Sequence, residues 1–147
     1  GHLIVDGAGD GKQAIGDVFG YFGSDGDRLQ AVAPARLLDT REGLGAKKAP
    51  MAANSTLDLQ VAGRGGVPNE ATAVVLNVAV TNVAAPSFVT VWPAGRTPNV
   101  TSNLNLMPGQ TIANLVICGL GDDGRLSFAN QLSSCDVIAD VTAFFIP

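Results

Sequence analysis

The chain has 147 residues, a length that suits one domain with a full hydrophobic core. Hydrophobic residues make up 46% of it and charged residues only 15%, the opposite of the balance found in disordered chains. The net charge of −4 lacks the basic excess of nucleic-acid binders, so we expect no nucleic-acid partner. No apolar run approaches the ~20 residues that span a bilayer, so we expect no membrane insertion.

Short apolar runs of strand character recur along the chain. In the run 56–61, Leu57, Leu59 and Val61 share one face, as in a strand with one side in the core and one in water. Further runs of strand length, rich in alternating or β-branched residues, lie at 73–81, 88–92, 103–106, 111–120 and 137–145.

Clusters of glycine and proline separate these runs at short intervals. They lie at 63–68, 93–95, 108–109 and 121–124. Regularly spaced short strands with such turns predict an all-β fold. We expect a single antiparallel β-sandwich, jelly-roll-like, with about eight to ten strands in residues 23–147.

The segment 1–22 resembles the last strand of the same chain. Leu-Ile-Val-Asp at 3–6 is similar to Val-Ile-Ala-Asp at 137–140, and Val-Phe-Gly-Tyr-Phe at 18–22 is similar to 141–145. Two interpretations stay open. Either residues 1–22 are a strand segment that closes an upstream repeat, or apolar strands simply resemble one another.

The two cysteines, Cys118 and Cys135, lie on either side of the turn 121–124. Such an arrangement predicts a disulfide between neighbouring strands, which favours an oxidising, extracellular setting. The alternative is a pair of buried free thiols.

From residue 34 onward the sequence resembles a known repeat. The residues 34–41 read Pro-Ala-Arg-Leu-Leu-Asp-Thr-Arg, and further matches follow in order at 61–68, 73–78, 89–95, 102–105, 109–116 and 137–145. This series is similar to a repeat of secreted bacterial proteins, especially actinobacterial ones, and covers about residues 30–145. The resemblance implies a secreted or cell-surface location and a role in attachment, display or spacing. It brings no set of catalytic residues, and the two cysteines and the insertion at 7–17 depart from the common pattern.

Catalytic signatures are scarce. His2, the only histidine, lies at a terminus, so a Ser-His-Asp or Cys-His arrangement would have to use it. Zinc sites of the usual His and Cys composition lack ligands. The glycines at 63–66 precede an apolar strand rather than a helix that could hold a phosphate. We therefore expect no enzyme activity and no catalytic residues.

Charged residues near the repeat's opening motif are candidates for ion pairs. Asp39 and Arg41 are two apart, so in a strand they project from the same face. We expect them to form, with Arg36, an ion pair that pins the chain, the alternative being a site for an anionic or hydroxyl-rich ligand. Asp140 lies among apolar residues and needs a partner. Its candidate partners are Arg36, Arg41 and Arg64.

Polar residues interrupt several apolar strands and suggest a ligand site. Amides near an aromatic ring suit sugar hydroxyls and ring faces. The alternative is the solvated face of a sheet. The candidates are Asn77, Asn103, Asn105 and Asn114, together with Trp92 or Tyr21.

Two acidic loops, 25–27 and 122–123, suggest structural calcium, although ordinary turns use the same residues. No other metal or cofactor is expected. The leading functional hypothesis is a non-catalytic extracellular or surface module for attachment or display, with cell-wall or other glycans as candidate ligands. The alternative is a self-assembling subunit of an extracellular filament or array, linked to neighbouring repeats or subunits through its N-terminal strand. A glycan-active enzyme is a third, weaker hypothesis.

Overall fold

The computed structural model describes residues 18, 20–21, 23–98 and 101–147, and this part of the chain is all-β. Its elements are β1 (Arg28–Asp39), β2 (Ser55–Gln60), β3 (Ala73–Thr81), β4 (Ser87–Pro93), β5 (Leu104–Leu106), β6 (Ile112–Gly119), β7 (Arg125–Asn130) and β8 (Asp136–Ile146). Within these residues there is no helix with the length and apolarity needed to cross a membrane.

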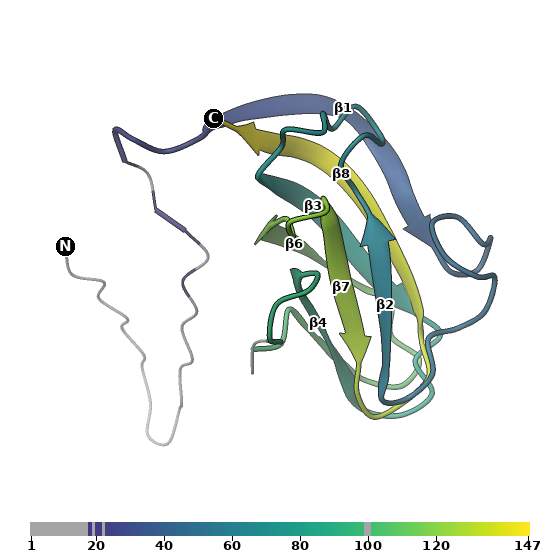
Figure 1. Ribbon diagram of the computed structural model, residues 1–147. Helices are drawn as coiled ribbons and strands as arrows, with labels where there is room; N and C mark the ends of the chain where they lie inside the picture. The colour runs from purple at the N-terminus through teal and green to yellow at the C-terminus, as the bar shows by residue number, and fades with distance from the viewer. Residues whose placement is uncertain (1–17, 19, 22, 99–100) are drawn as a thin grey trace, which may run out of the picture.

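The eight strands form two antiparallel four-stranded sheets (Figure 1). One has the order β1-β8-β3-β6 and the other β2-β7-β4-β5. The first strand pairs with the last, the second with the seventh, the third with the sixth and the fourth with the fifth. A long hairpin rolled over on itself gives this pairing, which is the jelly-roll form of a sandwich. The predicted antiparallel β-sandwich is confirmed.

The core lies between the two sheets and is made of alternate strand residues. On β3 the side chains of Val74, Leu76, Val78 and Val80 are fully buried, because a strand sends every second side chain to the same face. From the opposite sheet, Leu59 of β2 and Leu126 and Phe128 of β7 are equally inaccessible. Each such Leu or Phe contributes roughly 1.5–3 kcal/mol by leaving water, so this layer holds the two sheets together.

The strand predictions succeed for six elements and miss two. The expected run 73–81 coincides with β3, and the runs at 56–61, 88–92, 103–106, 111–120 and 137–145 overlap β2, β4, β5, β6 and β8. Strand β1 was missed because its residues 28–36 are exposed or half-buried and include Pro34. Strand β7 was missed because it has only six residues, although its Leu126 and Phe128 alternate with polar or small residues as in a strand with one buried face.

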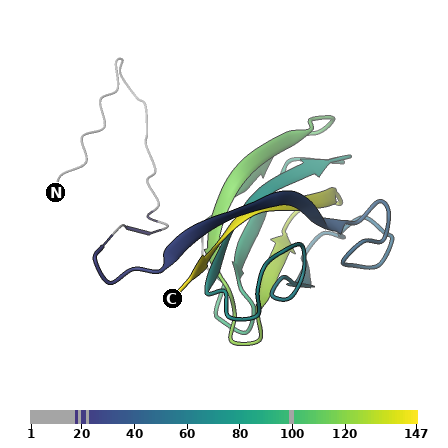
Figure 2. The same cartoon turned by 90° about the horizontal axis from the view of Figure 1, so that it is seen from above.

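The chain enters and leaves the sandwich at one corner. Arg28 lies opposite Ile146 in the β1–β8 ladder, and its Nη2 donates a hydrogen bond to the carbonyl of Pro147 at 3.1 Å. Figures 1 and 2 place the C-terminus beside the start of β1. Most of the segment 1–22 lies outside the described residues, so its resemblance to β8 stays a prediction. Val18 and Tyr21, which are described, are 91% and 92% exposed.

The predicted disulfide between Cys118 and Cys135 is wrong, because both thiols are free. The turn 121–124 joins β6 to β7, which belong to different sheets, so the strands that flank it are not neighbours. Cys118 lies opposite Val74 on β3, whereas Asp136, next to Cys135, lies opposite Thr81. Seven residues of strand separate these positions, about 23 Å, far beyond the ~7 Å limit between bridged Cα atoms. The cysteines thus offer no support for an oxidising compartment.

Thiol titration tests this correction. Burial raises the pKa of both Cys118 and Cys135 to about 11. At neutral pH we therefore expect slow alkylation of the folded protein and rapid alkylation of two thiols per chain in denaturant without reductant. Failure of the denatured, unreduced chain to react would restore the disulfide.

Candidate functional site

The outer face of the sheet β1-β8-β3-β6 points away from the core and is unusually apolar. The registers of the three ladders align its residues in rows that cross all four strands. A solvated face of an antiparallel sheet normally carries polar side chains. On this face two neighbouring rows contain only apolar residues and glycine. The first row is Leu29, Phe145, Ala73 and Gly119, and the second is Ala31, Ala143, Val75 and Ile117.

The two apolar rows are partly open to solvent. Leu29 is 52% exposed on β1 and Ile117 is 38% exposed on β6, while Val75 and Ala143 between them are 9% and 8% exposed. The face is therefore a flat apolar strip with more accessible side chains at its two edges. Monomeric proteins seldom leave contiguous apolar area of this kind uncovered unless it contacts something.

A hollow of about 320 Å³ lies over the first apolar row. Ala73, Ile117, Gly119 and Phe145 line it from the sheet, and Gly20 and Tyr21 line it from the N-terminal segment. Asp27 and Thr72 form its polar side, where the Thr72 hydroxyl donates a hydrogen bond to the Asp27 carboxylate. This combination of an apolar floor and a small polar rim is typical of binding surfaces.

The third row is polar and contains Arg36, Asp140, Asn77 and, at the β6 edge, Leu115. The guanidinium of Arg36 binds the carboxylate of Asp140 with two hydrogen bonds, Nε to Oδ1 at 2.8 Å and Nη2 to Oδ2 at 3.3 Å. The Asp140 side chain is 25% exposed, so it is half-buried, and Arg36 is the one of its three candidate partners that binds it. The pair borders the apolar rows, and because its two charges cancel, it adds no net charge to the face.

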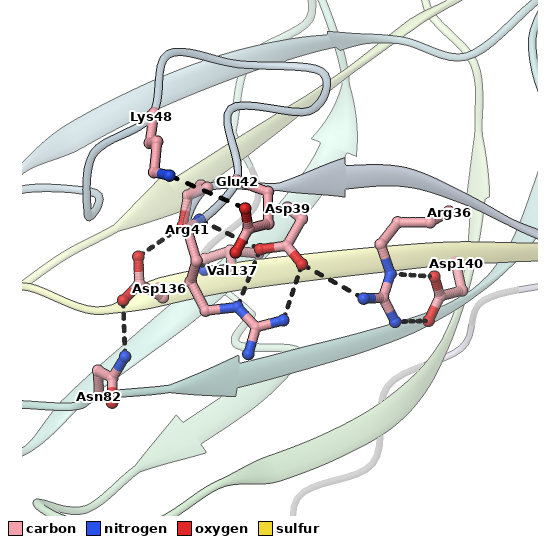
Figure 3. Close-up of polar contacts among 10 residues, drawn as sticks. Arg36, Asp39, Arg41, Glu42, Lys48, Asn82, Asp136, Val137 and Asp140 are labelled. Atoms are coloured by element: carbon pink, nitrogen blue, oxygen red, sulfur yellow. Dashed lines mark hydrogen bonds and ion pairs between the residues drawn. The ribbon is translucent and has the colours of Figure 1, made fainter.

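Asp39 is the centre of a larger cluster at the end of β1 (Figure 3). Its carboxylate accepts hydrogen bonds from Arg41 Nε at 2.9 Å and Arg41 Nη2 at 2.7 Å, and from Arg36 Nη1 at 3.3 Å. The side chain of Asp39 is only 3% exposed. The hydrogen bonds from Arg41 are the main cause that lowers the pKa of Asp39 from 3.8 to about 2, and they outweigh desolvation, which acts in the opposite direction. Arg41 follows the strand in a turn, so the pairing does not arise from a shared strand face as predicted.

A second carboxylate also holds the turn that follows β1. Asp136, at the start of β8, accepts hydrogen bonds from the Thr40 hydroxyl at 2.8 Å and from Asn82 Nδ2 at 2.9 Å. The backbone N–H of Val137 donates to the Thr40 hydroxyl at 3.1 Å. These bonds join the end of β1 to β8 and to the residue after β3. Together with the hydrogen bonds of Asp39, they make the motif at residues 34–41 a structural clamp between β1, β3 and β8.

Arg64 is not part of this clamp, although it was a candidate partner of Asp140. Its Nη1 donates to the carbonyl of Gln60 at 3.4 Å, in the loop after β2. The remaining candidates Arg36, Asp39, Arg41 and Asp140 are brought together. Sequence spacing gave no basis for placing Arg64, because loop positions are set by tertiary contacts.

The predicted amide and aromatic residues do not form one site. Trp92 is 5% exposed and its Nε1–H donates to the carbonyl of Arg96, so its ring is unavailable for stacking on a sugar. Asn103 accepts a hydrogen bond from the N–H of Val91, and Asn114 donates to the carbonyl of Asn103. Asn77 is exposed on β3, and Asn105, also exposed, accepts from the Ser102 hydroxyl. The amides chiefly hold irregular backbone between β4, β5 and β6.

The acidic residues considered for calcium have partners within the protein: in the loop 25–27, Asp25 accepts a hydrogen bond from Ser24 and Asp27 accepts one from Thr72, and in the loop 122–123 the partners are arginines. Asp122 binds Arg96 at 2.6 Å and Asp123 binds Arg125. Within the described residues no three His, Cys, Asp or Glu side chains come together as a metal site would require. Asp122 and Asp123 therefore serve as ion-pair partners.

The sequence analysis overlooked Leu29, Leu115, Ile117 and Phe145 on the outer face. A signal was present in the run 111–120, which is apolar at odd and even positions alike. A strand with one solvated face should alternate. A strand that lacks alternation at the edge of a sheet therefore predicts a contact surface on its second face.

The comparisons with known proteins identify no relatives. No model of a known protein family matches the chain, and no curated protein matches it. The resemblance to the actinobacterial repeat therefore stays a prediction.

Asp39→Asn tests the clamp. A carboxylate whose pKa is depressed on folding stabilises the fold above its ordinary pKa of 3.8, and this contribution disappears as the pH falls to about 2. Because its arginine partners are 40% and 46% exposed, solvent screening limits the effect to about 1–2 kcal/mol at pH 7. Urea unfolding at pH 7 and pH 2.5 measures it.

Asp140→Asn is the matched control, since it removes a more exposed carboxylate from the same network. We expect it to cost less than Asp39→Asn at pH 7. Equal losses for the two variants, or a loss for Asp39→Asn that does not shrink in acid, would contradict the assignment of Asp39 as the anchoring charge.

Proposed function

We propose that the chain is a non-catalytic module of the bacterial cell surface that attaches to a protein partner through the outer face of the sheet β1-β8-β3-β6. The observation that carries this proposal is the pair of apolar rows from Leu29 to Gly119 and from Ala31 to Ile117. A partner that covers them removes apolar area from water, which is the main favourable term in association.

The chemistry of this face favours a protein partner over a glycan. Sugar sites present exposed aromatic rings and convergent polar groups. Here Trp92 is buried, and Asn103 and Asn114 are used in hydrogen bonds within the protein. The outer face instead offers branched aliphatic residues, alanine and Phe145, with the Arg36–Asp140 pair beside them. Apolar area with charged residues at its border is typical of protein–protein contacts.

The proposal of a non-catalytic role rests on the state of the charged groups. The carboxylate of Asp39 accepts four hydrogen bonds from its own neighbours, and that of Asp136 accepts two. Carboxylates that are hydrogen-bonded within the protein in this way are less available as an acid or base for a substrate. The cell-surface location rests on the resemblance of residues 30–145 to the secreted repeat.

Co-sedimentation with actinobacterial cell envelopes tests the attachment. We expect the purified chain to bind native envelopes and to lose this binding when envelope proteins are digested. The variant Leu29→Lys/Ala31→Lys places two charges in the apolar rows and should weaken binding at least about tenfold. Leu132→Lys is the control, because Leu132 is 65% exposed on a loop outside the face.

Two results would overturn the proposal. One is an absence of binding to native envelopes. The other is undiminished binding to deproteinised cell wall, which would favour the glycan hypothesis instead.

We also propose that residues 1–22 link this sandwich to a neighbouring repeat rather than complete its own fold. The corner where Arg28 meets Pro147 brings entry and exit together, so a preceding unit ending near residue 22 would adjoin this one. The exposed positions of Val18 and Tyr21 are consistent with a segment that contributes little to the sandwich.

Deletion of residues 1–22 tests the linking role. Since β1 begins at Arg28, we expect the truncated chain to keep its thermal midpoint within about 2–3 °C, which corresponds to less than about 0.5 kcal/mol. Unfolding of the truncated chain would assign the segment to this sandwich's own core.

A further inference from the structure

The two sheets end in four edge strands, and three of them carry devices that block further pairing. Strand β1 contains Pro34, two register shifts and the charged residues Arg28 and Arg36. Strand β2 has only six residues and carries Asp58. Strand β5 has three residues. Prolines, charges, bulges and short length are the usual protections of an open edge.

Strand β6 carries none of these protections. It has eight residues, Ile-Ala-Asn-Leu-Val-Ile-Cys-Gly, without a charge or a proline. It pairs with β3 without a register shift, and it forms the end of its sheet. A strand of this length and composition at an edge is a template for another strand.

The free side of β6 presents the backbone groups of its odd-numbered residues, three of which, Ala113, Leu115 and Ile117, lie inside the strand. The N–H of Leu120 donates to the carbonyl of Thr72 at 2.8 Å, which places the hydrogen-bonded positions of this ladder at even-numbered residues of β6. Antiparallel ladders alternate, so the N–H and C=O groups of Ala113, Leu115 and Ile117 point away from β3. These three residues also send their side chains to the outer face, where Leu115 is 60% exposed.

We propose that two copies of this chain pair through β6 about a twofold axis at Leu115, and this inference rests on the proposed function of the same sheet face. Antiparallel pairing with Leu115 opposite Leu115 sets Ala113 opposite Ile117 on both sides of the axis. All three free positions then exchange hydrogen bonds, about six in total. The odd-numbered side chains of both copies stay on one face, so the two sheets join into one of eight strands.

The chemistry of the edge suits a second copy in particular. The chain has a net charge of −4, so its copies repel one another wherever their acidic residues meet. Strand β6 and the two apolar rows carry no charge, and this side of the sheet is where two copies approach without that cost. The apolar rows also end at β6, so the pairing continues them across the axis into the second copy.

Charge substitution at the axis tests the pairing in the full chain. We expect the purified protein to show twice its 15.0 kDa mass in light scattering or sedimentation. Leu115→Lys and Leu115→Glu each set two like charges face to face, and each should weaken the dimer at least about 100-fold. An equimolar mixture of the two variants should restore it, because lysine then faces glutamate. Leu29→Lys, on the opposite edge of the same face, should leave the dimer intact.

Several outcomes would overturn the proposal. A wild-type chain that is monomeric at every concentration would show that the dimer does not form. A mixture of the Lys and Glu variants that stays monomeric, while each variant keeps a folded circular dichroism spectrum, removes the Leu115 axis. Equal loss of the dimer in Leu29→Lys shows contact through the sheet face rather than through the edge.

Hydrogen exchange distinguishes a second copy from the chain's own N-terminal segment. Val18 lines a hollow of about 210 Å³ with Ile117, Cys118 and Gly119, so the segment that contains Val18 is the alternative occupant that the test must separate from a second copy. Protection of the Leu115 amide that grows with protein concentration supports the dimer. Protection that is independent of concentration, or no protection, overturns it.

The failure of this inference and of the proposed function are distinguishable. A monomer that binds native envelopes and loses binding in Leu29→Lys/Ala31→Lys retains the attachment function without the dimer. A dimer that fails to bind envelopes retains the pairing through β6 without the attachment function.

Discussion

The pairing of the last strand between the first and the third is the constraint on which the rest of the structure depends. Strand β8 lies inside its sheet and needs backbone partners on both edges. Its register with β1 sets Arg36 beside Asp140, and its first residue, Asp136, holds Thr40 and Asn82. The Arg36–Asp140 ion pair and the Thr40–Asp136 hydrogen bond are therefore consequences of this pairing, and they join residues about 100 positions apart in the chain. Contacts of such long range are slow to form, so the clamp stabilises a sheet that closes only when the last strand arrives.

The sequence predicted the sandwich well because strand periodicity and turn composition are local properties. The run 73–81 is apolar and β-branched, and it coincides with β3. What local pattern could not give is which strands are neighbours. The turn 121–124 looked like a hairpin, and the disulfide was inferred from it, yet β6 and β7 belong to different sheets. The ligand site failed for a related reason, since Trp92 lies on the outer side of its sheet, next to the core residue Val91, yet it is buried there and its Nε1–H is bonded to the carbonyl of Arg96. The partner of Asp140 could be narrowed to arginines by charge, but only the β1–β8 register selects Arg36.

The two faces of the sheet β1-β8-β3-β6 differ from those of an ordinary solvated sheet. Its inner side packs against β2-β7-β4-β5, and its outer side is also apolar over two rows. Since the buried residues Val75, Ala143 and Ile138 flank the polar Arg36–Asp140 pair, the face is shielded in its centre and open at its edges. Exposed apolar residues promote non-specific association unless they are confined. The arginine–aspartate pair confines them here by interrupting the apolar area across the sheet.

A binding surface on a sheet has a physical advantage over one built on loops. The backbone of β3 is bonded on both sides, so the rows of side chains on it are held in place before any partner arrives. Association then costs little conformational entropy, and modest apolar area suffices for useful affinity. An edge strand fixes the orientation of a partner. Hydrogen bonds at Ala113, Leu115 and Ile117 select one register of the paired strands, whereas apolar contact alone tolerates several. Attachment through the face and pairing through the edge therefore do not compete. In the proposed arrangement the face would supply the free energy of contact, and the uncharged edge would determine how neighbouring copies are oriented on a surface.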